Sequence, residues 1–373
     1  MLDFVLVGGG LANGLLAARL AATRPALSFV LVEAGDTLGG NHTWSFHGTD
    51  VSPAQRAWLA PLVARSWPAH DVAFHGGARR LGGEYHSITS ERFHAQLLAQ
   101  LGDRVRLGVK AREVGPTHVV LEGGERLEAR AVIDGRGFSG APDWPCGFQK
   151  FLGLDVELEA PHGLEVPLLM DGRVAQHGAF RFLYLLPWDE RRVLVEDTAY
   201  ADGPELDLPL LRARIHEYLA TRGMKVKTVL REEAAALPIP LSGEAPRLTR
   251  PTIGVAAGLF HATTGYSVPM AAELADALVA REDLSADALT AWLQAHARRH
   301  WSGQGFFRLL NRMLFRGAEP EARVKIFDSF YRHREATIAR FYAGRLNALD
   351  MAAILARGSR TVPGLRAMSA AFS

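Results

Sequence analysis

The sequence predicts an α/β fold with a dinucleotide-binding domain, an antiparallel-sheet domain inserted into it, and a helical C-terminal region. Three observations support this prediction. The first forty residues carry a strand–helix–strand pattern, four strand-like runs joined by short polar turns follow Gln149, and apolar residues recur at helical spacing after Arg281. The chain has 373 residues. Because single cores stop growing at about 250–300 residues, we expect two domains.

The N-terminal pattern is typical of a dinucleotide site. Residues 3–7 form a β-branched apolar run, a glycine triplet follows, and residues 11–20 are rich in Ala and Leu. A second apolar run, 29–32, ends on an acid 23 residues after the triplet. The glycines let a pyrophosphate approach backbone N–H groups at the positive end of a helix, and the carboxylate accepts hydrogen bonds from a ribose. The predicted contacts are Gly8, Gly10, Leu11, Ala12 and Glu33.

The next residues indicate that the dinucleotide is FAD. Asn13 stands where the third glycine of G-x-G-x-x-G is expected, and Gly14 comes one place later. A glycine pair within seven residues of the acid is typical of FAD enzymes rather than NAD dehydrogenases, because it lets backbone pass close to the ribityl chain and flavin. The predicted contacts here are Gly39, Gly40, Asn41 and His42.

Further segments complete the predicted cofactor domain. Helices are expected at 52–64, with Pro53 in the first turn, and at 90–101, with Ser90 as the cap. We expect a strand meander across 104–133, a small-residue strand at 253–258 and a helix at 268–280. Free N–H groups at the start of that last helix would face the flavin. The remaining predicted cofactor contacts are Asp134, Gly135, Gly258, Thr264, Gly265, Tyr266 and Ser267.

The inserted domain is predicted to be one antiparallel sheet. Its strand-like runs are 151–159, 166–170, 179–186 and 191–200, followed by a helix at 208–221 and a returning strand at 225–236. Glu196 and Asp197 are adjacent in the fourth run. Because side chains alternate along a strand, these two carboxyls face opposite sides. One of them therefore enters the space that the sheet covers, and a strand end with two solvated acids is the alternative that the spacing leaves open.

These segments divide the chain into three regions. Residues 1–75, 90–148 and 246–285 are assigned to the cofactor domain, 76–89 and 149–245 to the sheet domain, and 286–373 to the C-terminal helices. From Arg281 onward the chain has fifteen Lys and Arg but eight Asp and Glu. An apolar stripe (Phe306, Leu309, Leu310, Met313, Leu314) accompanies a basic one (Arg308, Arg312, Arg316). Such a helix docks on anionic lipid or, more commonly, caps the neighbouring domain.

Composition narrows the function classes. A net charge of +2 gives no reason to expect nucleic acid as a partner. The single cysteine, Cys146, excludes an internal disulfide and suits a reducing cytosol. No apolar stretch approaches the ~20 residues of a membrane span, and the N-terminus enters the first strand without a signal pattern, so a soluble or peripheral protein is expected. We predict no metal site, because His42 and His47 lack a third ligand and His296 and His300 lack a carboxylate partner.

With these segments placed, the chain resembles the bacterial lycopene β-cyclase family over nearly its whole length. The resemblance lies in 7–14 (VGGGLANG), 40–47 (GNHTWSFH), 195–198 (VEDT), 264–267 (TGYS) and 341–346 (FYAGRL), and Asn13 agrees with it. It implies an FAD fold like that of flavin hydroxylases and geranylgeranyl reductases. It also implies lycopene as substrate, γ- and β-carotene as products, and reduced FAD as a cofactor that is not consumed. NAD(P)H is then the expected reductant, and the inner membrane surface on the cytoplasmic side the expected location.

The implied chemistry needs an acid that holds its proton at neutral pH. Closing a β-ring requires protonation of a terminal alkene, a very weak base, and a carboxyl among apolar side chains has its pKa raised by desolvation. We predict Glu196 as this acid and Asp197 as the second member of the catalytic pair, which positions the strand or a neighbour. The predicted cavity-lining residues are Trp44, Phe182 and Tyr184. The rival hypotheses are an FAD-dependent isoprenoid reductase or hydroxylase of the same fold and a non-enzymatic carotenoid carrier.

Overall fold

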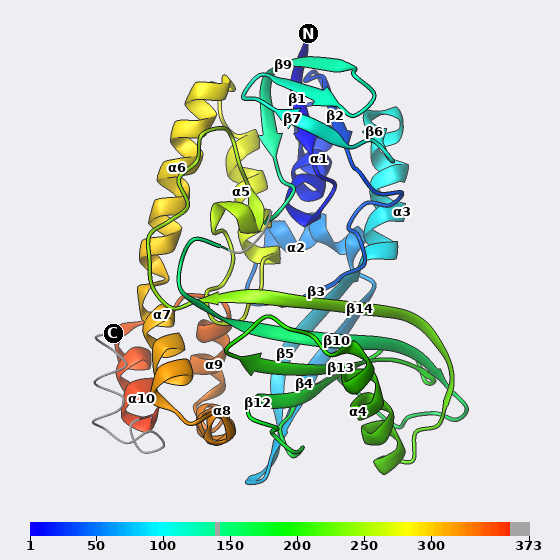
Figure 1. Ribbon diagram of the computed structural model, residues 1–373, viewed down its shortest axis with the longest axis vertical. Helices are drawn as coiled ribbons and strands as arrows, with labels where there is room; N and C mark the ends of the chain where they lie inside the picture. The colour runs from blue at the N-terminus through cyan, green and yellow to red at the C-terminus, as the bar shows by residue number, and fades with distance from the viewer. Residues whose placement is uncertain (139–141, 359–373) are drawn as a thin grey trace.

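The computed structural model describes residues 1–138 and 142–358. These residues form a six-stranded sheet and an eight-stranded sheet, which lie one after the other along the long axis of the molecule. The C-terminal helices lie beside the larger sheet (Figure 1). Within the same residues, no helix is long and apolar enough to cross a membrane, and no group of three or more His, Cys, Asp or Glu side chains is arranged to hold a metal ion.

The six-stranded sheet has the order β6-β2-β1-β9-β8-β7. Its strands are β1 (Leu2–Val7), β2 (Phe29–Val32), β6 (Val105–Arg106), β7 (Ala111–Val114), β8 (His118–Leu121) and β9 (Arg126–Asp134). β1 pairs parallel with both β2 and β9, so the carboxyl ends of these strands meet at one edge. Helices α1 (Leu11–Thr23), α5 (Val268–Val279) and α3 (Ser90–Leu101) belong to this half of the molecule, and α1 packs against the other two. The predicted βαβ unit is therefore confirmed.

The eight-stranded sheet has the order β14-β10-β13-β12-β11-β4-β5-β3. Its strands are β3 (Thr43–His47), β4 (Arg65–Phe74), β5 (Gly77–Thr89), β10 (Cys146–Leu158), β11 (Leu168–Asp171), β12 (Phe180–Pro187), β13 (Arg192–Ala201) and β14 (Val226–Pro240). Its pairs are antiparallel except for β11 with β4, and helix α4 (Leu208–Thr221) packs against β10 and β13. The four predicted strands, the helix and the returning strand are confirmed.

Several local predictions were wrong. Residues 43–47 and 65–74, both assigned to the cofactor domain, form β3 and β4 of the larger sheet. Residues 254–257 form a 3₁₀ turn instead of a strand, because Gly254 and Gly258 both have positive φ. Strand β6 lies parallel beside β2 and not in the meander. The cap of α3 is Thr89, whose hydroxyl accepts a hydrogen bond from Arg92 N–H. The division into three regions stays a prediction.

The C-terminal region is helical, as expected. Its elements are α6 (Ala286–Gly303), α7 (Gly305–Arg312), a π-helical turn (Met313–Gly317), α8 (Arg323–Phe330), α9 (Glu335–Tyr342) and α10 (Ala348–Gly358). Helix α7 packs against β14 and α8 against β12, so these helices cap one end of the larger sheet (Figure 1). The basic stripe is engaged within the protein, because Arg308 donates to Trp301 O at 2.6 Å and Arg312 to Leu241 O at 2.7 Å. Helix α2 (Pro53–Leu59) begins at the predicted position, capped by Ser52.

Candidate active site

The glycine turn after β1 has the close approaches that the sequence predicts. Gly8 has φ +93°, and an added Cβ would lie 2.9 Å from the Arg136 backbone. At Gly9 an added Cβ would lie 2.4 Å from a Leu38 methyl group. No side chain caps the N-terminus of α1 at Gly10, where an added Cβ would meet nothing closer than 4.0 Å. This combination of tight backbone and open N–H groups at a helix start fits a pyrophosphate.

The departure at Asn13 has a structural explanation. The Asn13 amide donates to Val7 O and Gly8 O, both at 2.9 Å, and so holds the helix on the end of β1. The close-packing role of the third glycine passes to Gly14, where an added Cβ would lie 2.3 Å from the Phe93 ring of α3. The substitution therefore leaves the turn able to accept a dinucleotide.

Glu33 and the second glycine pair lie against this turn. The Glu33 carboxylate accepts hydrogen bonds from Gly9 N–H at 2.6 Å and from Gly35 N–H at 2.7 Å. Gly39 N–H donates to Gly9 O at 2.8 Å, and both Gly39 and Gly40 have positive φ. The structure thus brings the predicted acid and glycines to the carboxyl end of β1, where dinucleotides bind in open α/β sheets.

Four other predicted contacts have partners within the protein. The Asp134 carboxylate is held by Arg136 and Arg250, and Gly135 N–H donates to Val7 O. The Asn41 amide is bonded to Glu232 O. At Gly258, an added Cβ would lie 3.1 Å from Pro246 and 3.2 Å from Trp301, so this glycine serves local packing. Sequence reasoning missed Gly254, where an added Cβ would lie 3.1 Å from the Ala12 side chain beside the start of α1.

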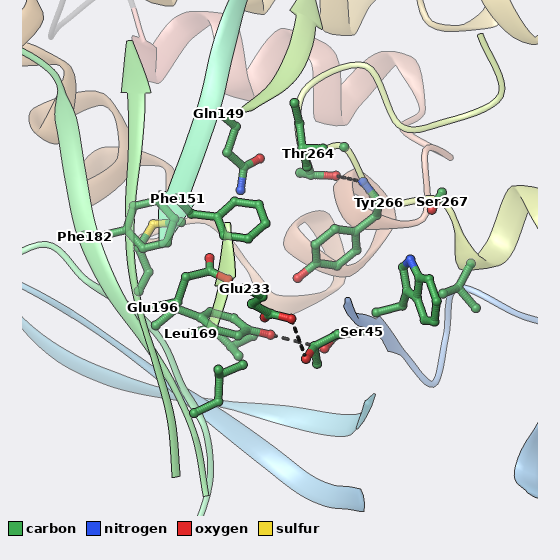
Figure 2. Close-up of a pocket in the computed structure, with 18 of the residues that line it drawn as sticks. Ser45, Gln149, Phe151, Leu169, Phe182, Glu196, Glu233, Thr264, Tyr266 and Ser267 are labelled. Carbon is green, nitrogen blue, oxygen red and sulfur yellow. Dashed lines mark hydrogen bonds between the residues drawn. The ribbon is translucent and has the colours of Figure 1, made fainter. Parts of the chain in front are cut away.

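A largely apolar cavity lies between the larger sheet and the loop before α5 (Figure 2). Its empty volume, including the mouth, is about 910 Å³. The predicted lining residues Trp44, Phe182 and Tyr184 all line it, as does Glu196. The predicted loop 264–267 forms another wall, and α5 starts there without a side-chain cap. His42 is not among the lining residues, but its ring centroid lies 5.9 Å from that of Trp44.

The sheet register places two carboxyls side by side on the cavity wall. Gly153 of β10 lies opposite Glu196 of β13 on one side and opposite Glu233 of β14 on the other. Tyr184 of β12 lies opposite Glu196, so the four residues form one row across four strands. Because Gly153 has no side chain, the two glutamates face the cavity with nothing from β10 between them, as Figure 2 shows for their side chains.

Glu196 is the residue best suited to hold a proton. Burial raises its pKa to about 8, and the neighbouring Glu233 adds to the rise, while a hydrogen bond from Thr198 Oγ1 opposes it. The part of its side chain that is not covered by protein lines the cavity. The carboxyl is therefore protonated at neutral pH and faces an apolar space.

Glu233 was missed by the sequence analysis. Its carboxylate accepts hydrogen bonds from Arg231 at 2.7 Å and from Thr43 at 3.1 Å, and its side chain is buried. Burial raises its pKa and Arg231 opposes that rise. Strand alternation alone could not identify it, because Glu232 and Glu233 are adjacent acids and only the register with Gly153 shows which one enters the cavity.

Asp197 lies on the opposite face of the sheet, so it does not share the cavity with Glu196. Its carboxylate accepts hydrogen bonds from Arg181 at 2.7, 2.7 and 3.0 Å. Both side chains are buried, and Asp197 is not among the residues that line the cavity. The strand alternation seen in the sequence therefore separates one carboxyl that faces the cavity from one that forms an ion pair. A part for Asp197 in catalysis stays a prediction, and this geometry limits it to positioning.

Tyrosine hydroxyls form a connected group at the cavity wall. The Tyr85 hydroxyl is hydrogen-bonded to that of Tyr184 and, at 2.9 Å, to that of Tyr266. Tyr184 also donates to Ser45 Oγ at 3.3 Å. Burial raises the pKa of each of these three tyrosines well above its ordinary value. The rings of Tyr184 and Tyr266, which line the cavity, therefore remain neutral and electron-rich and can stabilise a nearby cation.

Comparisons with known proteins show the family of the chain. A family model described as lycopene cyclase protein matches residues 3–368. The chain is 47% identical to a lycopene beta-cyclase of Pseudescherichia vulneris, over 100% of this chain and 98% of that protein. It is 44% identical to a lycopene beta-cyclase of Pantoea ananas, over 99% and 97%.

Solved structures of similar fold share little sequence with the chain. A geranylgeranyl bacteriochlorophyll reductase-like protein of Thermoplasma acidophilum aligns with a TM-score of 0.59 at 11% identity, over 95% of this chain and 96% of that one. A flavin-dependent halogenase of Brevundimonas sp. aligns with a TM-score of 0.59 at 14% identity, over 99% and 96%. These likenesses confirm the predicted fold class.

Proposed function

The chain belongs to the lycopene cyclase family, and we propose that it is a lycopene β-cyclase. It would close β-rings at the two ends of linear lycopene, giving γ-carotene and then β-carotene. The observation that carries this proposal is Glu196, a carboxyl with a pKa of about 8 that faces an apolar cavity. Such a group is protonated at neutral pH and gives up its proton only to a substrate that reaches it.

The proposed reaction rearranges bonds without net change in atoms or electrons. Glu196 donates its proton to C2 of the terminal alkene, which leaves a cation at C1. The C5=C6 electron pair then forms the C1–C6 bond and moves the cation to C5. Loss of the C6 proton to the Glu196 carboxylate restores the acid and leaves the C5=C6 bond of the β-ring. The neutral rings of Tyr184 and Tyr266 would stabilise the cation in this sequence.

The proposal includes FAD, and the residues present fit it. The N–H groups at the start of α1 would hold the pyrophosphate and Glu33 the ribose, while the start of α5 would lie beside the flavin. When bound in its reduced form, with NAD(P)H as the reductant, FAD would supply negative charge near the cation and no net electrons. Replacing Gly9 with Val should abolish the flavin absorbance of the purified protein, since an added Cβ already lies 2.4 Å from Leu38.

We further propose that the enzyme docks on the cytoplasmic face of the membrane, where its substrate dissolves. Arg308 and Arg312 bind carbonyl groups, so docking through the C-terminal helices would use exposed cations such as Lys325 and Arg334. Flotation with anionic vesicles should fall in a Lys325→Glu, Arg334→Glu double variant. Equal flotation of the variant and the wild type would contradict the proposal.

The direct test of the function is expression in cells that accumulate lycopene, followed by separation of the pigments. We expect lycopene to be replaced by γ-carotene and β-carotene. The purified protein should use NAD(P)H only to reduce the flavin at the start. Consumption of NAD(P)H in proportion to product would instead favour the reductase or hydroxylase hypothesis, and unchanged lycopene bound to the protein would favour the carrier.

A further inference from the structure

A second cavity lies between the C-terminal helices and the larger sheet. Its empty volume, including the mouth, is about 860 Å³. Its walls come mainly from α7, the π-helical turn, α8, α9 and α10. The apolar side chains that line it include Leu310, Met313, Leu314, Ile326, Phe327 and Phe330.

The second cavity adjoins the cavity that contains Glu196. Four residues, Met170, Tyr200, Thr264 and Tyr342, line both. The two tyrosines are fixed by hydrogen bonds, Tyr200 to Thr263 O at 3.0 Å and Tyr342 to the Tyr331 hydroxyl. Met170 is the flexible member, because its unbranched side chain has several accessible rotamers. The wall between the two cavities is thus one side chain thick.

The chemistry of the second cavity suits a hydrocarbon. Among the described residues that line it, Arg357 carries the only permanent charge, and burial lowers the pKa of His333, which is therefore neutral at pH 7. A polar ligand would find few partners among such walls. A long apolar chain would instead be removed from water along its length.

We propose that the second cavity holds the unreacted remainder of the polyene while one end of the molecule lies at Glu196. This inference rests on the proposed function. A conjugated C40 polyene is a rigid, extended molecule, much longer than a cavity of about 910 Å³ is wide, so part of it must lie outside the cavity that contains Glu196. After the first ring closes, the chain must bind in the reverse direction. The second cavity must then accept the new ring, and its width sets how readily the second end is cyclised.

The test uses a substitution that narrows the second cavity at a residue that does not line the first. Leu310→Trp adds bulk from α7, and Leu309→Trp is the matched control, because Leu309 lies on the same helix and does not line the cavity. The holoenzymes are assayed with lycopene and with a shortened acyclic polyene that carries the same terminal group. We expect Leu310→Trp to cyclise lycopene about tenfold more slowly, to raise the ratio of one-ring to two-ring product at equal lycopene consumption, and to process the short polyene at the wild-type rate.

Each other outcome decides against the inference. A Leu310→Trp enzyme with wild-type rate and product ratio overturns it, and so does an equal loss on the long and short substrates, which indicates general damage. If Leu310→Trp does not fold, Ile326→Phe on α8, which also lines the second cavity, is judged by the same two ratios. A wild-type enzyme that cyclises neither substrate overturns the proposed function itself, whereas selective loss in the variant concerns only the second cavity.

Discussion

The two faces of strand β13 place adjacent carboxyls in different electrostatic surroundings. Glu196 faces the cavity, with another carboxyl, Glu233, as its charged neighbour across Gly153. Asp197 faces the other side and accepts three hydrogen bonds from the buried Arg181. Burial raises the pKa of both, but Arg181 opposes the rise at Asp197, while Glu233 reinforces it at Glu196. Burial without a hydrogen-bonded cation therefore produces an acid, and burial with one produces a structural ion pair.

The largest expected effect is on the cavity face. Glu196→Gln should reduce cyclisation by about 10²–10⁴-fold, the usual contribution of a general acid, because the amide N–H is far too weak an acid to protonate an alkene. The folded protein should be at least as stable as the wild type at pH 8, since the substitution removes the cost of ionising a buried carboxyl. Pigment separation and thermal unfolding measure the two effects. Full conversion of lycopene by the variant would remove Glu196 from the mechanism.

The next largest expected effect is on stability, at the face of β13 that carries Asp197. Asp197→Asn should lower the free energy of unfolding by about 3–5 kcal/mol, because it leaves the buried Arg181 charge without its partner. Asp155→Asn is the matched control: its partner Arg192 is 39% exposed and can turn to water, so the loss should be smaller. Denaturant titration measures both. An Asp197→Asn protein as stable as the wild type would contradict the structural ion pair with Arg181.

The smallest expected effect is a shift in the pH above which cyclisation is lost. The charged or titratable groups that act on Glu196 are Glu233, Asp197 and Arg231, and Glu233 raises its pKa more than Asp197 does. In the wild type, cyclisation should be lost as the pH rises through about 8, because Glu196 then loses its proton. Glu233→Gln removes a repelling charge, so the pKa of Glu196 falls and this limit moves to lower pH.

The control for that shift is the adjacent acid. Glu232 is paired with Arg212 and does not line the cavity, so Glu232→Gln should keep the wild-type pH profile. The measurement is the cyclisation rate of purified holoenzyme from pH 6 to 9, with activity at pH 6 little changed in both variants. An alkaline limit that stays in place in Glu233→Gln would contradict the coupling between the two carboxyls.

The N-terminal βαβ unit, the antiparallel sheet and the opposed faces of Glu196 and Asp197 could be predicted from the sequence. Each of these follows from local periodicity: alternation in strands, helical spacing, and glycines where backbone must pass closely. It did not determine that 43–47 and 65–74 join the larger sheet, or that 254–257 form a 3₁₀ turn, because pairing partners and turn geometry depend on distant residues.

The surroundings of each carboxyl depend on the fold of the whole chain. The neighbour of Glu196 across Gly153 comes from β14, and the partner of Asp197 comes from β12, so neither is visible in the residues beside them along the chain. The same holds for the second cavity, whose walls come from helices and strands far apart in sequence. Local pattern fixes which way a side chain points on a strand, whereas its pKa depends on charges and solvent brought to it by the folding of the whole chain.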